Sequence, residues 1–331
     1  MANLQFPYPR KSSVPTVSTS PRRSTYLRQR RAIRTYGPPL IGLTAIIWLL
    51  FYLFSAHPTT TTTTTLAIPP RPSNPPDVVI VTPLDPSLPP SLTSTIRANR
   101  NHYARLHNYA TLFPSTHAYD LLPGTPFSWS LVPSLRHAQT LHPHTPWIWH
   151  LSSTALIMNT TLSLDSHLLS PSVLPSLLLP DTPVVPPDSV IHTPSHRNPA
   201  STSIILSRDA TGLAHDSFLI RNSEWAKFFL DAWFDPLYRS YNFQKAERHA
   251  LEHIVQWHGT VLAKVGLVQQ RVLNGYVKKE EKGGEEGMYR DGDLVANFWG
   301  CGKEQGRASC EKEMGPMMEK WRGMRDAEGR T

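Results

Sequence analysis

The stretch Trp-Ile-Trp-His-Leu-Ser-Ser-Thr-Ala-Leu-Ile-Met-Asn, residues 147–159, indicates the fold most directly. Its two apolar segments, residues 147–151 and 155–158, have the length and the apolar content of buried strands. Three hydroxyl residues, Ser152, Ser153 and Thr154, separate them. We therefore expect two strand pieces that flank a polar turn.

The rest of the body alternates between strand-like and helix-like segments. Residues 78–82, Val-Val-Ile-Val-Thr, form the continuous apolar run that is typical of a parallel strand buried on both faces. Residues 99–113 carry an apolar stripe at helical spacing. This alternation predicts an α/β fold. Further strands are expected at 203–207, 218–221 and 266–272, and further helices at 131–141, 223–234 (with Ser223 as the N-cap) and 245–258.

The net charge of +8 belongs to one end of the chain. Residues 1–37 contain eight Arg and Lys residues and no acid, so the remaining residues carry 33 − 8 = 25 basic side chains against 25 acidic ones. A formally neutral body lacks the basic face that nucleic-acid binding requires. We therefore expect no nucleic-acid partner, and we interpret residues 1–37 as a basic cytosolic tail.

Residues 38–56 are almost wholly apolar and match the thickness of a bilayer core when helical, at about 1.5 Å rise per residue. The run begins too far from the start for a cleaved signal peptide, so we interpret it as a signal anchor. Basic residues before it predict a cytosolic N-terminus and a lumenal C-terminal body. Residues 57–76 are rich in Thr and Pro and indicate a stem. The folded domain is expected at 77–310, followed by a charged tail at 311–331.

Several segments of the body resemble, in the same order, the motifs of glycosyltransferase family 34. The resemblance covers about residues 78–310. It rests on Asn99-Arg100 with Tyr103-Ala104 and His107; on Trp129, Pro133, Arg136 and Pro143; on residues 204–209, Gly212-Leu213 and 217–223; on Gln270-Arg271, Asn274 and Tyr276; and on residues 292–295 with Phe298, Gly300 and Cys301.

This resemblance implies a GT-A type glycosyltransferase domain, with a Rossmann-like mixed sheet, behind the single transmembrane helix. It implies a retaining hexosyl transfer from a nucleotide sugar to a glycan, usually with Mn²⁺. Among the branches of the family, the chain resembles the α-1,6-mannosyltransferase subunits of fungal mannan polymerase complexes. That branch implies GDP-mannose as donor, an N-glycan outer chain as acceptor, a hetero-oligomeric complex and a type II protein of the Golgi membrane.

The resemblance also identifies a departure from the family. Carboxylates hold a divalent cation against the leaving diphosphate, and the family supplies them as Asp-x-Asp together with a histidine. The corresponding residues here are Ser152, Thr154 and Asn297. Neutral hydroxyl and amide oxygens are weak ligands for Mn²⁺, so we expect these positions to hold no metal.

Three explanations for this loss remain open. The chain is a catalytically impaired subunit with a scaffold or regulatory role; or it is a metal-independent enzyme in which Arg248 or Arg208 neutralises the diphosphate; or other groups, with His215 and Asp216 the nearest in the motif, rebuild the cation site.

Other site residues follow from the matched motifs. Asp209 and Glu247 are the candidate catalytic carboxylates, one for organising the acceptor and one for stabilising an oxocarbenium-like centre. Their alternatives are a turn residue and a solvated helix face. The candidates for binding the nucleotide sugar are Asn99, Arg100, Tyr103, His107 and Arg136, although Tyr103 also suits core packing and Arg136 a surface ion pair.

Three smaller features complete the predictions. Cys301 and Cys310 are the two cysteines, and an oxidising lumen favours a disulfide between them. Asn159-Thr160-Thr161 is an N-glycosylation sequon. His249 and His253 have the i, i+4 spacing of a zinc site, but the surrounding sequence lacks the His-Glu-x-x-His pattern of a metalloprotease.

Overall fold

The computed structural model describes residues 46–50, 73–121, 123–185, 189–196, 198–241, 246–278, 285–302 and 308–328. The chain divides into two compact units, residues 1–68 and 69–331. In the first unit only residues 46–50 are described, and they are helical and exposed. The expected basic tail lies outside the described residues, as do most of the expected anchor and most of the stem. Among the helices that are described, none has the length and apolar character needed to cross a bilayer.

The second unit is built on a mixed six-stranded sheet in the order β2-β1-β3-β6-β5-β7. β1 is parallel to both β2 and β3, and β5 is parallel to β7, while β6 runs antiparallel to its neighbours β3 and β5. The strands are β1 (Val78–Val81), β2 (Ala110–Leu112), β3 (Trp147–Leu151), β5 (Ile204–Asp209), β6 (Gly212–Arg221) and β7 (Val265–Val268). The α/β class and the mixed sheet expected from the sequence are confirmed.

A smaller sheet continues from the polar turn at residues 152–154, which we call the hydroxyl turn. It pairs β4 (Ala155–Ile157) with β9 (Val295–Asn297), and β9 with β8 (Gly275–Tyr276). Residues 152–154 join β3 of the large sheet to β4 of the small one, so the two predicted strand pieces lie in different sheets. The polar turn is therefore the point at which the chain passes from one sheet to the other.

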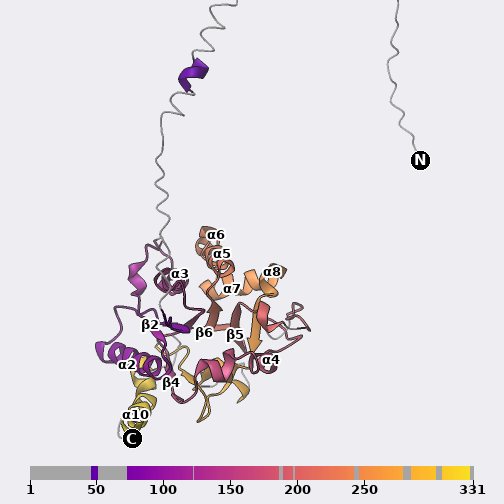
Figure 1. The fold of residues 1–331 in the computed structure, drawn as a ribbon. Coiled ribbons are helices and arrows are strands. Elements are labelled where there is room, and N and C mark those ends of the chain that lie inside the picture. The colour runs from indigo at the N-terminus through magenta and orange to yellow at the C-terminus, as the bar shows by residue number, and fades with distance from the viewer. Residues whose placement is uncertain are drawn as a thin grey trace, which may run out of the picture. The chain divides into compact units, whose positions relative to one another are not determined.

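Helices lie on both faces of the large sheet (Figure 1). Ser223 caps one of them as predicted, because its hydroxyl accepts a hydrogen bond from the Ala226 amide at 3.3 Å. The α-helices are α2 (Pro90–His107), α3 (Leu131–Leu141), α4 (Leu174–Leu177), α5 (Glu224–Trp233), α6 (Pro236–Ser240), α7 (Ala246–Trp257), α8 (Gly259–Leu262), α9 (Gln270–Leu273) and α10 (Cys310–Glu328). Short turns of 3₁₀ or π-helix are η1 (Thr116–Ala118), η2 (Phe127–Ser130), η3 (Asp165–Leu169), η4 (Pro199–Ser201) and η5 (Glu285–Gly287).

The two-residue pleat of the strands divides the core into two layers. In β1, Val79 and Val81 pack with residues of α3, α5 and α7, whereas Val78 and Ile80 pack on the opposite face with α2 and the segment around α4. Figure 1 shows α3, α5 and α7 on one side of the sheet and α4 on the other. The sheet is thus buried on both faces, as the continuous apolar run of residues 78–82 predicts.

Two element boundaries differ from the sequence expectation. The helix expected at 99–113 spans Pro90–His107, and Asn108 ends it with a left-handed φ of 55°, after which the chain enters β2. The strand expected at 266–272 ends at Val268, and α9 follows. In both cases the apolar residues of two adjacent elements follow one another so closely that the sequence pattern predicts a single element.

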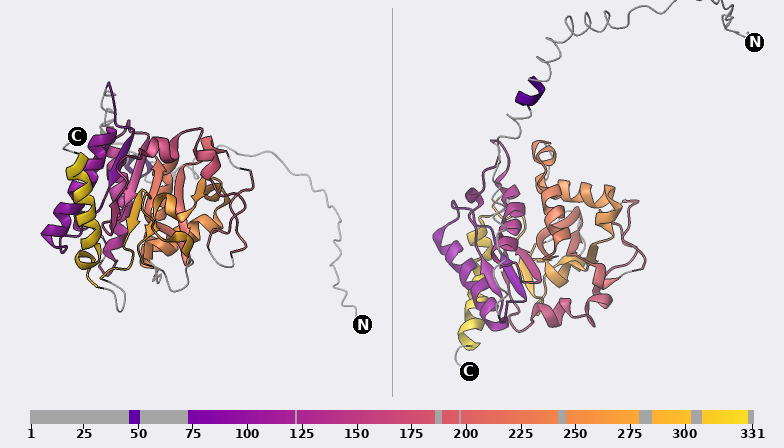
Figure 2. Two further views of the ribbon diagram at one scale, coloured as in Figure 1. Left: turned by 90° about the horizontal axis from the view of Figure 1, so that it is seen from below. Right: turned by 45° about the horizontal axis from the view of Figure 1, so that its top comes forward.

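The segment expected as a charged tail is the helix α10. Its side chains Met314, Met318 and Trp321 are buried in a third core cluster with residues of α2, β4 and β9. α10 lies alongside α2 (Figure 2), and the Arg322 guanidinium donates to the Thr95 hydroxyl at 2.8 Å. The folded body therefore extends beyond residue 310, because one face of the charged segment is apolar.

Candidate functional site

The hydroxyl turn forms one wall of a cavity of about 510 Å³. Ser152 and Thr154 follow the carboxyl end of β3, and Pro83 and Asp85 follow the carboxyl end of β1, its parallel neighbour. Ligands of α/β proteins bind at such strand ends. The other lining residues used below are Phe127, Ser128, His150, His215, Asp216, Glu247, Trp299, Gly300, Cys301 and Cys310.

Ser152, Thr154 and Asn297 converge on one another. The Ser152 and Thr154 hydroxyl oxygens lie 3.0 Å apart, and the Thr154 hydroxyl donates to Asn297 Oδ1 at 3.0 Å. The Asn297 amide in turn donates to Asn274 Oδ1 at 2.6 Å. Residues from β9 and from the β3–β4 turn are thus joined by a neutral hydrogen-bond network.

This network does not fit Mn²⁺. A divalent cation of this kind prefers ionised carboxylates, whereas the oxygens here are neutral and already engaged with one another. Over the part of the chain that the structure describes, no group of three or more His, Cys, Asp or Glu side chains is arranged to hold a metal ion. No reaction step through a cation follows from these residues.

A second polar group lies on the β6 side of the cavity. β6 bulges here: Leu206 of β5 pairs with Phe218 and the next residue, Ser207, pairs with Ala214, so residues 215–217 have no partner on β5. Bulges re-aim side chains and occur often beside functional sites. Both His215 and Asp216 line the cavity, and the Asp216 carbonyl accepts from the Ser152 amide at 2.7 Å.

Glu247, from the first turn of α7, completes this group. One carboxylate oxygen lies 3.1 Å from His215 Nε2, and the other accepts from the Ser128 hydroxyl at 2.6 Å. Burial raises the pKa of Glu247, but these contacts outweigh it and leave the pKa below its usual value. Burial lowers the pKa of His215, yet Glu247 and Asp216 raise it above its usual value. Each group therefore favours the charged form of the other.

Two further cavity groups are shifted toward their neutral forms. Burial raises the pKa of the Asp216 carboxyl. Burial, with the charge of His215 as a smaller cause, lowers the pKa of His150 to about 3. His150 Nδ1, His215 Nδ1 and Asp216 Oδ2 are buried and have no hydrogen-bond partner among the described residues.

Asp209, the other candidate catalytic carboxylate, lies away from this cavity among its own partners. One oxygen is paired with the Arg248 guanidinium, and the other accepts from the Tyr276 hydroxyl at 2.9 Å. Burial raises the pKa of Asp209, but Arg248 lowers it by more, so the net pKa is below its usual value. Asp209 joins β5, α7 and β8 in a buried ion-pair network, and it does not line the cavity of Glu247.

Asn99 and Arg100 hold the backbone around β4. The Asn99 amide donates to the Ile157 carbonyl at 2.9 Å and accepts from the Ile157 amide at 3.0 Å. Arg100 is fully buried and donates to the Ser152 and Ala155 carbonyls at 2.8 and 2.6 Å. Burial lowers the pKa of Arg100 to about 9. These two side chains hold the backbone of the hydroxyl turn and of β4, and neither of them lines the cavity.

The remaining candidates for the nucleotide sugar also lie outside the cavity lining. The Tyr103 hydroxyl donates to the Leu162 carbonyl at 2.6 Å, and His107 Nε2 lies 2.8 Å from the Thr160 carbonyl, so both support the segment after β4. Arg136 pairs with Asp231 at 2.9 Å near the surface of α3 and α5. Tyr103 is thus packed in the core and Arg136 is in a surface ion pair, which are the alternatives given above for these two residues.

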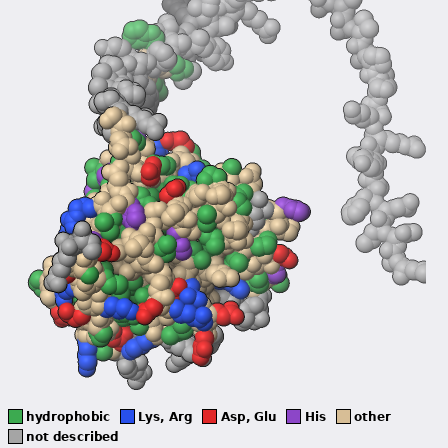
Figure 3. Space-filling view, turned by 60° about the horizontal axis from the view of Figure 1, so that its bottom comes forward, with side chains coloured by type: hydrophobic (Ala, Val, Ile, Leu, Met, Phe, Trp, Pro, Cys, Tyr) green, Lys and Arg blue, Asp and Glu red, His purple; other side chains and the backbone are tan. Residues whose placement is uncertain are grey.

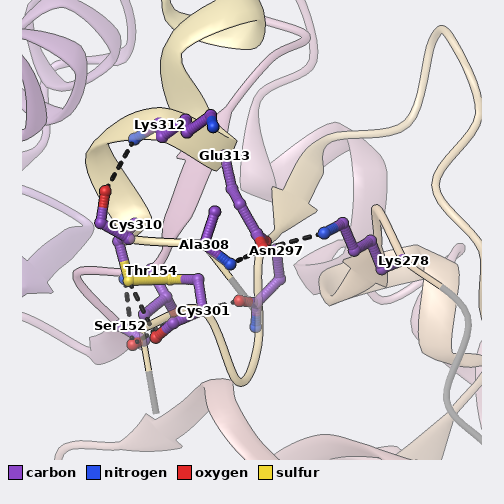
Figure 4. Close-up of a disulfide and its surroundings, with 10 residues drawn as sticks. Ser152, Thr154, Lys278, Asn297, Cys301, Ala308, Cys310, Lys312 and Glu313 are labelled. Carbon is purple, nitrogen blue, oxygen red and sulfur yellow. Dashed lines mark hydrogen bonds and ion pairs between the residues drawn. A yellow bond between two sulfur atoms is a disulfide. The ribbon is translucent and has the colours of Figure 1, made fainter. Parts of the chain in front are cut away.

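Cys301 and Cys310 form a disulfide with a Cα–Cα distance of 4.9 Å, and both residues line the cavity. Figure 4 shows the disulfide close to Ser152, Thr154 and Asn297. Asn159 lies at a different cavity, of about 540 Å³, where its side-chain amide donates to the Gly292 carbonyl at 2.8 Å. The site of the sequon is thus half-buried rather than an open loop tip.

The charge of the cavity is unusual for a diphosphate site. Its described lining residues include Asp85, Asp216 and Glu247 but no Lys or Arg. Arg248, suggested above as a counter-charge, is enclosed by Asp209 and Glu252, and Arg208 donates to the Pro183 carbonyl. On the face seen in Figure 3, basic and acidic side chains are interspersed and form no single-sign patch.

Sequence reasoning did not identify Asp85, Ser128, His150 and Trp299 as cavity residues. For His150 a signal was available, since the two-residue period of β3 places it on the opposite face from Trp147 and Trp149. Ser128 carried no such signal, because its contact with Glu247 joins residues 119 positions apart.

A mixed α/β body with a ligand-sized cavity at the carboxyl ends of parallel strands is the architecture of many ligand-binding α/β proteins. The chain belongs to the galactosyl transferase GMA12/MNN10 family, whose model matches residues 74–308.

Individual relatives agree with this family. An uncharacterized alpha-1,2-galactosyltransferase of Schizosaccharomyces pombe is 32% identical over 66% of this chain and 64% of its own length. The probable alpha-1,6-mannosyltransferase MNN11 of Saccharomyces cerevisiae is 32% identical over 74% of this chain and 62% of its own length. The chain thus spans less than two thirds of these relatives. A solved glycosyltransferase involved in glycosylation of the major capsid of PBCV-1 has a TM-score of 0.48 at 10% identity, covering 74% of this chain and 99% of that one.

Proposed function

We propose that the chain is a Golgi glycosyltransferase of the GT-A type that transfers a hexose from a nucleotide sugar to a glycan. GDP-mannose is the donor and an α-1,6-linked mannan chain the acceptor that we propose. The protein would be anchored by residues 38–56 with its body in the lumen, as a subunit of a hetero-oligomeric mannosyltransferase complex. Membership of the family and the mannosyl and galactosyl names of its relatives support the transfer of a hexose.

The cavity is the observation that carries this proposal. It gathers the hydroxyl turn, the β6 bulge and Glu247 at one point, although these lie far apart in the sequence. Glu247 is nine-tenths buried, ionised and fixed by Ser128 and His215. A carboxylate so placed can stabilise positive charge that develops at a sugar carbon.

Transfer by the purified full-length chain tests the proposal. With GDP-mannose and an α-1,6-mannobiose acceptor, mass spectrometry should detect a product one hexose larger. EDTA should leave the rate unchanged, because no three His, Cys, Asp or Glu side chains among the described residues are arranged to hold a cation. Glu247→Gln should lower the rate by about 100-fold or more. Glu224→Gln, which neutralises an exposed acid on α5, is the matched control and should retain the rate.

A second candidate is a non-catalytic subunit with the same fold, which supports a catalytic relative. The neutral network of Ser152, Thr154 and Asn297 favours it, because these oxygens cannot neutralise a diphosphate. Absence of product from GDP-mannose and UDP-galactose, in the presence or absence of Mn²⁺, together with stimulation of a co-expressed catalytic relative, would select this candidate and reject the first.

A further inference from the structure

A second cavity, of about 540 Å³, lies between the loop after β4 and the last helix. None of its lining residues lines the cavity beside the hydroxyl turn. Three segments form its wall: residues 158–161 after β4, the segment of Tyr289, Asp291 and Gly292 before β9, and the last turns of α10. Its volume falls within the range of small-ligand sites, about 300–1,000 Å³.

The sequon forms part of this wall. Asn159 Oδ1 accepts from the Thr161 amide at 3.2 Å and from the Thr161 hydroxyl at 2.7 Å, while Asn159 Nδ2 donates to the Gly292 carbonyl at 2.8 Å. Asn159 is half-buried and Thr161 is exposed. A side-chain amide nitrogen carries two hydrogens, so the bond to Gly292 leaves one of them for substitution. Asn159 can therefore carry a glycan in the folded protein and keep this bond.

The rest of the wall combines apolar surface with an ion pair. Tyr289 and Met324 supply aromatic and aliphatic surface. Lys320 pairs with Asp291 at 2.6 Å, and the side chains of this pair are 43% and 76% exposed, so the cavity opens to solvent at this edge. An N-acetylhexosamine has C–H faces, hydroxyl groups and an amide, which suit apolar surface beside a few polar groups.

We propose that Asn159 is N-glycosylated and that its first sugar, an N-acetylglucosamine, packs into this cavity and ties α10 to the loop after β4. The donor is an oligosaccharide on a polyprenyl diphosphate. The bond from sugar C1 to the diphosphate oxygen breaks, a bond from C1 to Asn159 Nδ2 forms, one amide proton is lost, and the lipid diphosphate leaves. The inference rests on the lumenal placement in the proposed function and not on whether the chain transfers sugar.

Translation of the full-length chain with sealed endoplasmic-reticulum microsomes tests the modification. Protease added outside should leave the body intact, and the wild type should gain the mass of one N-glycan, because Asn159-Thr160-Thr161 is the only sequon in the chain. Asn159→Gln and Thr161→Ala should each abolish the gain. Asn198→Gln, which changes an exposed asparagine outside any sequon, is the matched control and should keep it.

The melting temperature Tm tests the packing of the sugar. One form of the full-length chain comes from eukaryotic cells, trimmed by an endoglycosidase to a single N-acetylglucosamine; the other comes, disulfide-bonded, from bacteria without a glycan. The sugar should raise Tm by about 2–4 °C, a shift typical of one added packing contact in a body of this size. Met324→Ala and, separately, Tyr289→Ala should abolish this rise, whereas Met317→Ala, on α10 but outside the cavity, should retain it.

A body that is protected from protease but carries no glycan would overturn the inference and leave the proposed location standing. A body digested by protease would reject the lumenal location and the inference together. A glycan that persists in Asn159→Gln, equal Tm values for the two wild-type forms, or an undiminished rise in both cavity variants would also overturn the inference. A glycosylated chain that transfers no sugar would reject only the catalytic candidate.

Discussion

At the scale of single residues, buried polar groups rather than apolar ones determine how the candidate site is held. Arg100 is the clearest case, because its fully buried guanidinium donates hydrogen bonds to the carbonyls of Ser152 and Ala155. Those carbonyls belong to the turn that lines the cavity and to β4. Loss of Arg100 would take the guanidinium donor from both carbonyls, and the Ser152 carbonyl would keep only the Ala155 amide at 3.2 Å. A buried polar group that loses its partner costs more than the net worth of the bond itself.

Replacing Arg100 by Met should therefore lower the free energy of unfolding by about 3 kcal/mol or more. Arg105→Met, an identical change at an exposed position of the same helix, should alter it by less than about 0.5 kcal/mol. Urea denaturation of both variants measures the difference. Equal losses in the two would mean that the Arg100 contacts add nothing to stability.

His150 should make the protein sensitive to mild acid. Its folded-state pKa of about 3 lies below the usual 6.5, so an unfolded chain binds a proton there before the folded chain does. The stability that neutral His150 contributes is complete above pH 6.5 and declines as the pH falls toward 3. At pH 5 the loss is about 2 kcal/mol, from roughly 1.4 kcal/mol per pH unit.

His215 works in the opposite direction, because its raised pKa adds stability at low pH and loses it as the pH rises. His150→Gln isolates the His150 contribution from this opposing one. The difference between urea unfolding free energies at pH 7.5 and pH 5 should shift by about 2 kcal/mol between wild type and variant. An unchanged difference would show that His150 is protonated as readily in the folded state.

At the scale of elements, α10 shows how a charged segment can belong to a core. Its composition is dominated by charged residues, yet Met314, Met318 and Trp321 are spaced along one face and are buried against α2, β4 and β9. The helix also contacts α2 through Arg322 and the Thr95 hydroxyl. It therefore secures the small sheet that carries Asn297.

Trp321→Ala should lower the free energy of unfolding by about 3–5 kcal/mol, since it empties a fully buried aromatic site. Trp257→Ala makes the same change on α7, where the side chain is 75% exposed, and should cost less than about 0.5 kcal/mol. Chemical denaturation of the two variants provides the comparison. A small effect of Trp321→Ala would show that α10 contributes little to the core.

At the scale of the whole molecule, the candidate site exists only where distant segments meet. Thr154 and Asn297 are 143 residues apart yet share a hydrogen bond, and Ser128 meets Glu247 across 119 residues. Ser152, Thr154 and Asn297, the positions at which we expect the family's metal ligands, lie within one network. A single substitution that introduces a charged ligand therefore leaves the other two positions with neutral oxygens.

Introducing two acids and one histidine at these three positions tests this cooperation. The triple variant Ser152→Asp, Thr154→Asp, Asn297→His should acquire saturable Mn²⁺ binding in calorimetric titration, whereas the wild type and each single variant should not, because one charged ligand cannot hold the ion. Saturable Mn²⁺ binding by the wild type would contradict the neutral-network interpretation.

The sequence by itself determined the α/β class, the strand pieces around residues 152–154, the Ser223 cap and the family. These depend on periodicity, capping and the order of motifs, all of which can be followed along the chain without knowing which segments pack together. Tertiary structure decided the rest. Asn99, Arg100, Tyr103 and Asp209 match family motifs, but their contacts are with backbone and buried charges away from the cavity.

Only folding brought His150, His215, Asp216 and Glu247 to one cavity beside the hydroxyl turn. The physical reason is that burial and charge depend on which segments pack together, and the sheet pairs strands that are far apart in the chain. A pattern of residue types can therefore predict that a metal site has lost its ligands, but only the packed structure determines which polar groups surround those positions.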